Sequence, residues 1–218
     1  GREVDVYGEA RLGYRWRSGD IDREVGEAVL REGRFESGTV FGRLWVDRLN
    51  NAYFPTRGYA GKLEYALFRK EFGNDADLDQ LQASVSRFHT VGAHTFGLGA
   101  QLNTTLEGAA AVQDRFRLGG FLHLSGYNQD AISGQHSALL IATYYRRYAR
   151  LRLLPWYVGA SLEYGNVWED RDDMAWDSGI AAGSVFVGAD SPLGPLYLGY
   201  GHAERGRNAG FFYLGKTF

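Results

Sequence analysis

The sequence predicts an all-β chain whose antiparallel strands form a transmembrane β-barrel. Three observations predict this fold: polar and apolar residues alternate over long stretches, the polar face carries small or charged residues, and aromatic residues gather at strand ends on the apolar face. The 218 residues include 30 Gly and no Cys. So many glycines disfavour a mainly helical chain, and no apolar run is long enough for a transmembrane helix. We expect residues 1–218 to form a single domain.

The strands are predicted from a period of two, which only a strand has among the regular elements. In the first segment Glu9, Arg11 and Arg15 alternate with Leu12 and Trp16. The same alternation recurs along the chain and predicts about ten strands, at residues 4–17, 38–49, 59–68, 78–88, 94–102, 137–147, 156–168, 179–190, 194–204 and 209–218.

The two faces of these strands separate a membrane barrel from a soluble β-sandwich, in which the polar face would point into bulk water. The polar face suits a wet, crowded lumen, lined by Glu9, Arg11, Arg15, Arg43, Asp47, Lys62, Glu64 and Glu163. The apolar face ends in aromatic residues typical of girdles at membrane surfaces, namely Trp16, Tyr59, Tyr145, Tyr164, Trp168, Tyr200 and Phe218. A soluble sandwich is the less favoured alternative, and the lumen charges are as consistent with mutual pairing in a narrow barrel as with conduction.

The connections alternate in length, as in barrels whose short turns face the periplasm and whose long loops face outward. A turn cluster is predicted at 50–58, a tight turn at 191–195, and long loops at 18–38, 169–177 and 204–210. Residues 169–173 with Asp177 form an acidic cluster. A solvated loop tip is the favoured interpretation of this cluster over a divalent-cation site, because nothing in the sequence fixes the carboxylates in a coordination geometry.

The C-terminal segment places Phe212, Leu214 and Phe218 in one phase of the last strand. The strand would therefore end with an aromatic side chain at the membrane boundary. Such an end resembles the signal by which bacterial outer-membrane proteins are recognised for insertion.

A glycine-rich stretch, FRLGGFLHLSGYNQD at residues 116–130, breaks the alternation. Along the chain, YFPTRG is followed by FRLGG with LSGY, then by SPLGP and a closing LGKTF. This ordered set resembles the bacterial surface-antigen barrel superfamily, which includes outer-membrane assembly factors and two-partner secretion transporters. The LSGY form with LGG ahead of it is most similar to barrels of patatin-like phospholipase autotransporters, the type Vd secretion proteins.

The resemblance implies that a long loop, here residues 107–136, folds into or over the lumen and that its tip binds carboxylates of the barrel wall. The matching tip residues are Gly119, Gly120, Ser125, Gly126 and Tyr127. Serine stands at position 125 where the family usually has arginine, so the cation of the usual ionic contact is missing. Ser125 can still hydrogen-bond and Tyr127 can still pack. Family barrels have sixteen strands, so about ten strands imply a fragment of a longer parent, which we favour, or a shortened relative.

The resemblance further implies a bacterial outer-membrane translocator or anchor that helps to secrete or display an N-terminal passenger, a patatin-like phospholipase. A passive pore or anchor without secretion activity is the alternative. The expected partners are the lipid bilayer and its lipopolysaccharide, the outer-membrane assembly machinery, the covalently attached passenger and, through open strand edges, another copy of the chain.

The residues themselves offer no catalytic or metal-binding motif. The five His show no metal-ligand spacing, and no Gly-x-Ser-x-Gly elbow is present. Ser137 follows His136, but neighbours on a strand point to opposite faces and cannot form a dyad. We therefore expect no enzyme, cofactor or metal site in this chain, and the net charge of -2 gives no reason to expect nucleic acid.

Overall fold

A computed structural model describes residues 2–5, 8–21, 33–74, 76–148, 154–191 and 193–215. The strands along these residues are β1 (Arg2–Asp5), β2 (Gly8–Ile21), β3 (Gly33–Asp47), β4 (Gly58–Phe68), β5 (Leu78–Val91), β6 (His94–Glu107), β7 (Phe116–Leu118), β8 (Ile132–Gly134), β9 (His136–Tyr148), β10 (Trp156–Trp168), β11 (Ile180–Ser191), β12 (Gly194–Ala203) and β13 (Arg207–Leu214). One-turn 3₁₀ helices lie in the connections: η1 (Lys70–Phe72), η2 (Val112–Asp114), η3 (Arg171–Asp173), η4 (Trp176–Ser178) and η5 (Glu204–Gly206). No helix within the described ranges has the length and apolar character needed to span a bilayer.

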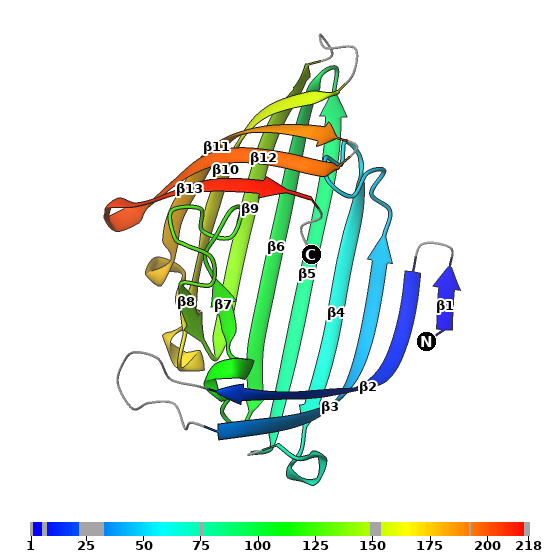
Figure 1. Ribbon diagram of the computed structural model, residues 1–218, viewed down its shortest axis with the longest axis vertical. Helices are drawn as coiled ribbons and strands as arrows, with labels where there is room; N and C mark the ends of the chain where they lie inside the picture. The colour runs from blue at the N-terminus through cyan, green and yellow to red at the C-terminus, as the bar shows by residue number, and fades with distance from the viewer. Residues whose placement is uncertain are drawn as a thin grey trace.

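Among the described residues, eleven strands form one sheet in the order β1-β2-β3-β4-β5-β6-β9-β10-β11-β12-β13, and β7 pairs with β8 in a second, small sheet. Neighbouring strands are antiparallel throughout, as between β10 and β11, so the predicted all-β antiparallel fold is confirmed. The large sheet curves around a hollow (Figure 1). Its edges are β1 and β13, and the pairings of the described residues do not join them. The sheet is therefore open in this structure; the sequence predicted a barrel but left it undecided whether this chain closes on itself or keeps open edges.

The ten long strands, β2–β6 and β9–β13, lie where the alternation placed them. The first predicted strand, residues 4–17, is wrong in one respect, because it is divided between β1 and β2, which pair with Arg2 opposite Ala10. Alternation continues through both strands, so the period does not show where the chain reverses. The sequence also missed β7 and β8, whose strands have 3 residues each.

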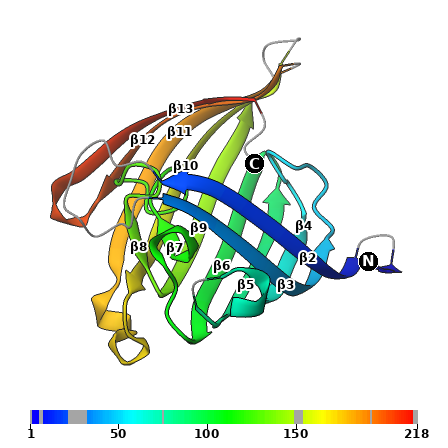
Figure 2. The ribbon, with the colours of Figure 1, turned by 60° about the horizontal axis from the view of Figure 1, so that its bottom comes forward.

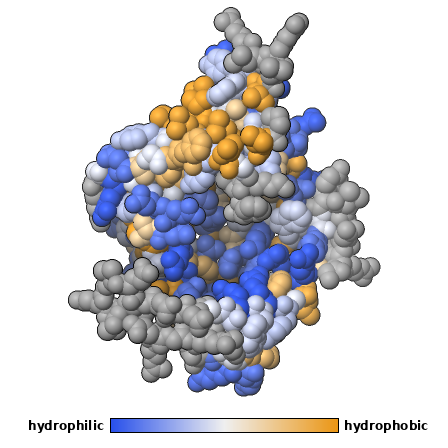
Figure 3. Space-filling model, in the orientation of Figure 1, coloured by the Kyte–Doolittle hydropathy of each residue, from blue (hydrophilic) through white to orange (hydrophobic). Residues whose placement is uncertain are grey.

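The two faces of the large sheet differ in character. Leu12, Leu98 and Leu162 point outward and are 77%, 68% and 73% exposed, as expected for side chains that meet lipid. On the opposite face Glu64 and Glu163 are 2% and 3% exposed. Figure 3 shows hydrophilic residues within the hollow and hydrophobic residues gathered on the outside of the upper end. Apolar residues therefore cover the outside, and charged residues line the inside.

Tyr145 lies on the inner face, so its assignment to the aromatic girdle is wrong. It shares the inward phase of Leu139 on β9 and is 4% exposed, and its hydroxyl donates a hydrogen bond to the carbonyl of Pro55. The adjacent Tyr144 has the outward phase and stacks beside His94. The prediction failed because both faces of β9 are largely apolar, so composition does not distinguish them.

Candidate functional site

The connection between β6 and β9 turns back into the hollow of the sheet. We call residues 119–130 the loop tip; it follows β7 and lies inside the curve of the strands (Figures 1 and 2). Gly119 and Gly120 have φ angles of 124° and 108°, which glycine adopts without a steric penalty. Leu122 and Leu124 also have positive φ angles, 62° and 73°. Such backbone persists only where surrounding contacts impose it, so the tip depends on the wall against which it packs.

Ser125 of the loop tip binds Glu163 of β10 through two hydrogen bonds. The Ser125 amide donates to Oε2 at 2.7 Å, and its hydroxyl donates to Oε1 at 2.6 Å. Ser161 donates a third hydrogen bond to Oε1 at 2.5 Å, and its hydroxyl lies 2.7 Å from that of Ser184 on β11. Ser125 is 0% exposed. The carboxylate is therefore satisfied by neutral donors within a dry contact.

Two glycines set how closely the loop tip approaches the wall. A Cβ on Gly201 of β12 would lie 1.6 Å from the carbonyl oxygen of Ser125, and a Cβ on Gly126 would lie 2.2 Å from the amide nitrogen of Ala203. The tip backbone therefore lies directly against the backbone of β12. At this distance the short serine side chain reaches Glu163.

Tyr127 packs beside this contact. It is 8% exposed and belongs to a buried cluster with Leu124, Leu139 and Ala203. The guanidinium of Arg207 lies 5.5 Å from the centre of its ring, a distance at which a cation is attracted to an aromatic face. Apolar packing and hydrogen bonds thus hold the same tip.

The charged residues of the inner face form separate groups. Glu64 of β4 collects three cations, with Arg43 at 2.6 Å, Lys62 at 3.2 Å and Arg15 at 3.5 Å. The guanidiniums of Arg15 and Arg43 also lie over the ring of Phe41, at 4.8 and 5.2 Å. We call these residues the Glu64 cluster.

The remaining predicted lumen residues do not join the Glu64 cluster. Glu9 pairs with Arg11 at 2.7 Å on β2. Asp47 accepts a hydrogen bond from the amide of Leu49 at 2.8 Å, so it stabilises the start of a turn. Glu163 binds the loop tip as described above. The sequence predicted these charges on the lumen face, whereas their partners depend on the register of the strands, which the sequence does not give.

The segments that flank the loop tip, residues 110–115 and Gln135, are held by contacts that the sequence analysis did not predict. Arg17 of β2 pairs with Asp114 at 2.5 Å, and Arg115 pairs with Glu169 at 2.7 Å. Gln135 accepts from the amide of Ala110 at 2.8 Å and donates to its carbonyl at 3.0 Å. Arg17 and Asp114 are 97 positions apart, so no local pattern indicates their contact. Among the described residues, no group of three or more His, Asp or Glu side chains is arranged to hold a metal ion.

The last strand presents Phe212 and Leu214 to the outside, 66% and 55% exposed. Phe218, the third residue of the predicted membrane-targeting end, lies outside the described residues. The inner face of β13 instead contacts the loop tip, because Phe121 lies 5.8 Å from Phe211 and 6.1 Å from Tyr213 between ring centres.

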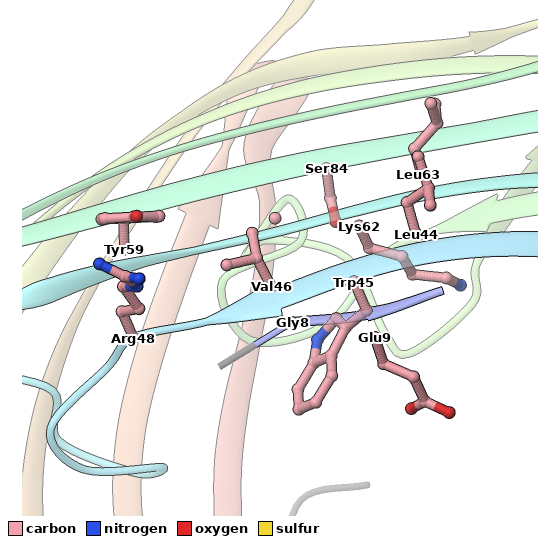
Figure 4. Close-up of a pocket in the computed structure, with 11 residues that line it drawn as sticks. Gly8, Glu9, Leu44, Trp45, Val46, Arg48, Tyr59, Lys62, Leu63 and Ser84 are labelled. Atoms are coloured by element: carbon pink, nitrogen blue, oxygen red, sulfur yellow. The ribbon is translucent and has the colours of Figure 1, made fainter. Parts of the chain in front are cut away.

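A separate surface pocket of about 510 Å³ lies along strands β2–β4. Figure 4 shows Leu44, Val46 and Leu63 on one side of the strands there, with Trp45 and Glu9 on the other. Trp45 is a large aromatic residue on the inner face, and it is 45% exposed. The apolar side of this pocket belongs to the outward face of the sheet, so the pocket is separate from the loop tip.

Comparison with known proteins gives the family. The model of the Omp85 superfamily domain matches residues 1–218. A solved structure with a similar fold is BamA from Haemophilus ducreyi lacking POTRA domains 1–3, with a TM-score of 0.71 and 13% sequence identity over 97% of this chain and 51% of that chain. The chain thus spans about half the length of that structure, and no curated protein matches it. The chain belongs to the Omp85 superfamily and is a β-barrel protein of the bacterial outer membrane.

Proposed function

We propose that this chain anchors a longer protein in the outer membrane and helps to secrete or display an N-terminal passenger, a patatin-like phospholipase. The observation that carries the proposal is the loop tip within the hollow, held to Glu163 by Ser125. A segment held inside a barrel by a small set of contacts is suited to control the passage of a polypeptide. The Leu-Gly-Gly and Leu-Ser-Gly-Tyr sequences of this loop support the phospholipase-type passenger.

In this proposal the chain carries out no catalytic step, and lipid hydrolysis belongs to the passenger. The outward leucines support contact with the bilayer and its lipopolysaccharide, and Phe212 and Leu214 support recognition by the outer-membrane assembly machinery. The open edges β1 and β13 support pairing with a second copy of the chain.

Deletion of residues 119–128 tests the proposal in a parent protein whose passenger carries a surface-detectable tag. We expect surface display to fall sharply while the barrel still folds, as measured by heat-modifiable gel migration. Deletion of residues 172–176, in the β10–β11 connection, is the control and should leave display unchanged. Normal display without residues 119–128 would refute the role of the loop tip.

A passive pore or anchor is the second candidate function, favoured by the Glu64 cluster, whose charged side chains line the hollow. Planar-bilayer recordings separate the two candidates. A steady, large conductance supports the pore, whereas small, flickering currents that increase when residues 119–128 are deleted support a translocator with a seated loop.

A further inference from the structure

The short connection between β3 and β4 also enters the hollow. We call residues 50–57 the inner turn. Its shape is set by its own asparagines: Asn50 Oδ1 accepts from the amides of Thr56 and Arg57, each at 2.9 Å, and Asn51 Oδ1 accepts from that of Phe54 at 2.9 Å. In Figure 1 this turn lies beside the ends of β11 and β12, at the opposite end of the hollow from β7.

Phe54 anchors the inner turn to the far wall. Its side chain is 2% exposed, and its ring stacks on Tyr157 of β10 at 4.1 Å and on Tyr197 of β12 at 4.8 Å between ring centres. The Tyr197 hydroxyl donates to the carbonyl of Tyr53 at 2.6 Å, and the Tyr145 hydroxyl donates to that of Pro55. The turn thus reaches from β3 and β4 across the hollow to β9, β10 and β12.

The loop tip enters from the other end and contacts the same aromatic residues. The ring of Phe121 lies 5.3 Å from that of Phe186 on β11 and 5.6 Å from that of Tyr197. Phe186 belongs to the buried cluster of Phe54 and lies 6.2 Å from Tyr197. Phe186 and Tyr197 therefore connect the two inward-folded segments.

Glycines leave space for these rings on the wall. A Cβ on Gly188 of β11 would lie 2.6 Å from Cζ of Phe54, and a Cβ on Gly159 would lie 2.4 Å from Cζ of Phe186. A Cβ on Gly199 would lie 3.3 Å from Cβ of Phe186 and 3.5 Å from Cε2 of Phe121. The wall is bare backbone at these points, so the rings pack directly on it.

We propose that the inner turn is a second plug of the hollow and a positioning element for the loop tip, such that release of the turn loosens the tip and release of the tip loosens the turn. Two segments that pack on the same side chains are energetically coupled, and the coupling acts equally in both directions. The inference extends beyond the proposed function, because it holds whether or not a passenger crosses the hollow.

Hydrogen–deuterium exchange on the full chain in detergent micelles tests the coupling. Phe54→Ala removes the anchor, and Gly188→Val occupies the space of the Phe54 ring from the wall. We expect each substitution to speed amide exchange in residues 50–57 and, by about tenfold, in residues 119–130, since contacting residues couple by amounts of that order. Gly42→Val is the matched control, because no atom lies within 4 Å of a Cβ placed there.

The pattern of exchange separates coupling from general loss of structure. Coupling speeds exchange in the two segments and leaves the β4–β5 ladder unchanged, whereas global destabilisation would speed exchange in that ladder as well. In the reverse direction, Ser125→Ala should speed exchange in residues 50–57. The double variant Phe54→Ala/Phe121→Ala should speed exchange at the tip by less than the product of the single effects.

A milder variant keeps the test decisive if the large substitutions prevent folding. Thr90→Ala removes the hydrogen bond from the Thr90 hydroxyl to the carbonyl of Thr56, 2.6 Å long, without touching the aromatic residues. It should speed exchange in both segments, though less than Phe54→Ala. Faster exchange in residues 50–57 with unchanged exchange in residues 119–130 would overturn the proposal.

Discussion

Glu163→Gln is expected to release the loop tip, because it removes the charged acceptor of two tip hydrogen bonds at nearly constant size. Hydrogen bonds to a charged group contribute about 1.5–3 kcal/mol and neutral ones about 0.5–1.5 kcal/mol. In the glutamine side chain one carboxylate oxygen is replaced by an NH₂ group, which is a donor and cannot accept the hydrogen bond that Ser125 donates there. Since Glu163 is 3% exposed, water cannot replace the lost bond in the seated state. We expect a loss of about 2–3 kcal/mol, which raises the fraction of open tip by about 30- to 150-fold.

Amide exchange measured by mass spectrometry reports this opening directly. The Ser125 amide donates to Glu163 Oε2 at 2.7 Å, so it becomes free to exchange when the tip leaves the wall. Glu9→Gln serves as the control, because Glu9 pairs with Arg11 and is not in contact with Ser125. Equal exchange of the tip in Glu163→Gln and in the parent would refute the conclusion that this carboxylate holds the loop.

Three further substitutions test other parts of the structure. Gly201→Ala should also free the tip, since its Cβ would overlap the Ser125 carbonyl; Gly210→Ala, with open space around its Cβ, should not, and proteolysis of the loop distinguishes them. Glu64→Gln should lower the free energy of unfolding in urea by about 1–2 kcal/mol, less than for a fully buried ion pair because its cations are partly exposed; an unchanged midpoint would contradict a stabilising cluster. Leu162→Arg should impair folding into lipid vesicles by about 2–4 kcal/mol, whereas Leu193→Arg, in the β11–β12 turn and 79% exposed, should fold normally if the outward face meets lipid.

The sequence predicted the ten long strands and the face on which most charges lie, because both follow from a local period of two. Ser125 and Glu163 were each predicted as inward residues, but their contact depends on how the loop enters the hollow, which no local pattern encodes. The ion pair between Arg17 and Asp114 was not predicted from the sequence for the same reason. Tyr145 was misplaced because apolar residues occur on both faces of β9. The inner turn was predicted only as a turn cluster, since the partners of Phe54 lie on strands distant in the sequence.

The neutral donors around Glu163 give the loop tip a different response to ionic strength from that of the opposite wall. Dissolved salt screens charges that reach water, with a Debye length of about 8 Å at 0.15 M, and has little effect on buried contacts. Arg15 and Arg43 are 40% and 27% exposed where they pair with Glu64, so their attraction weakens as salt is added. The serine contact is buried and joins only one charged group, so it persists. A salt titration therefore loosens the wall of β2–β4 first and distinguishes events there from release of the tip.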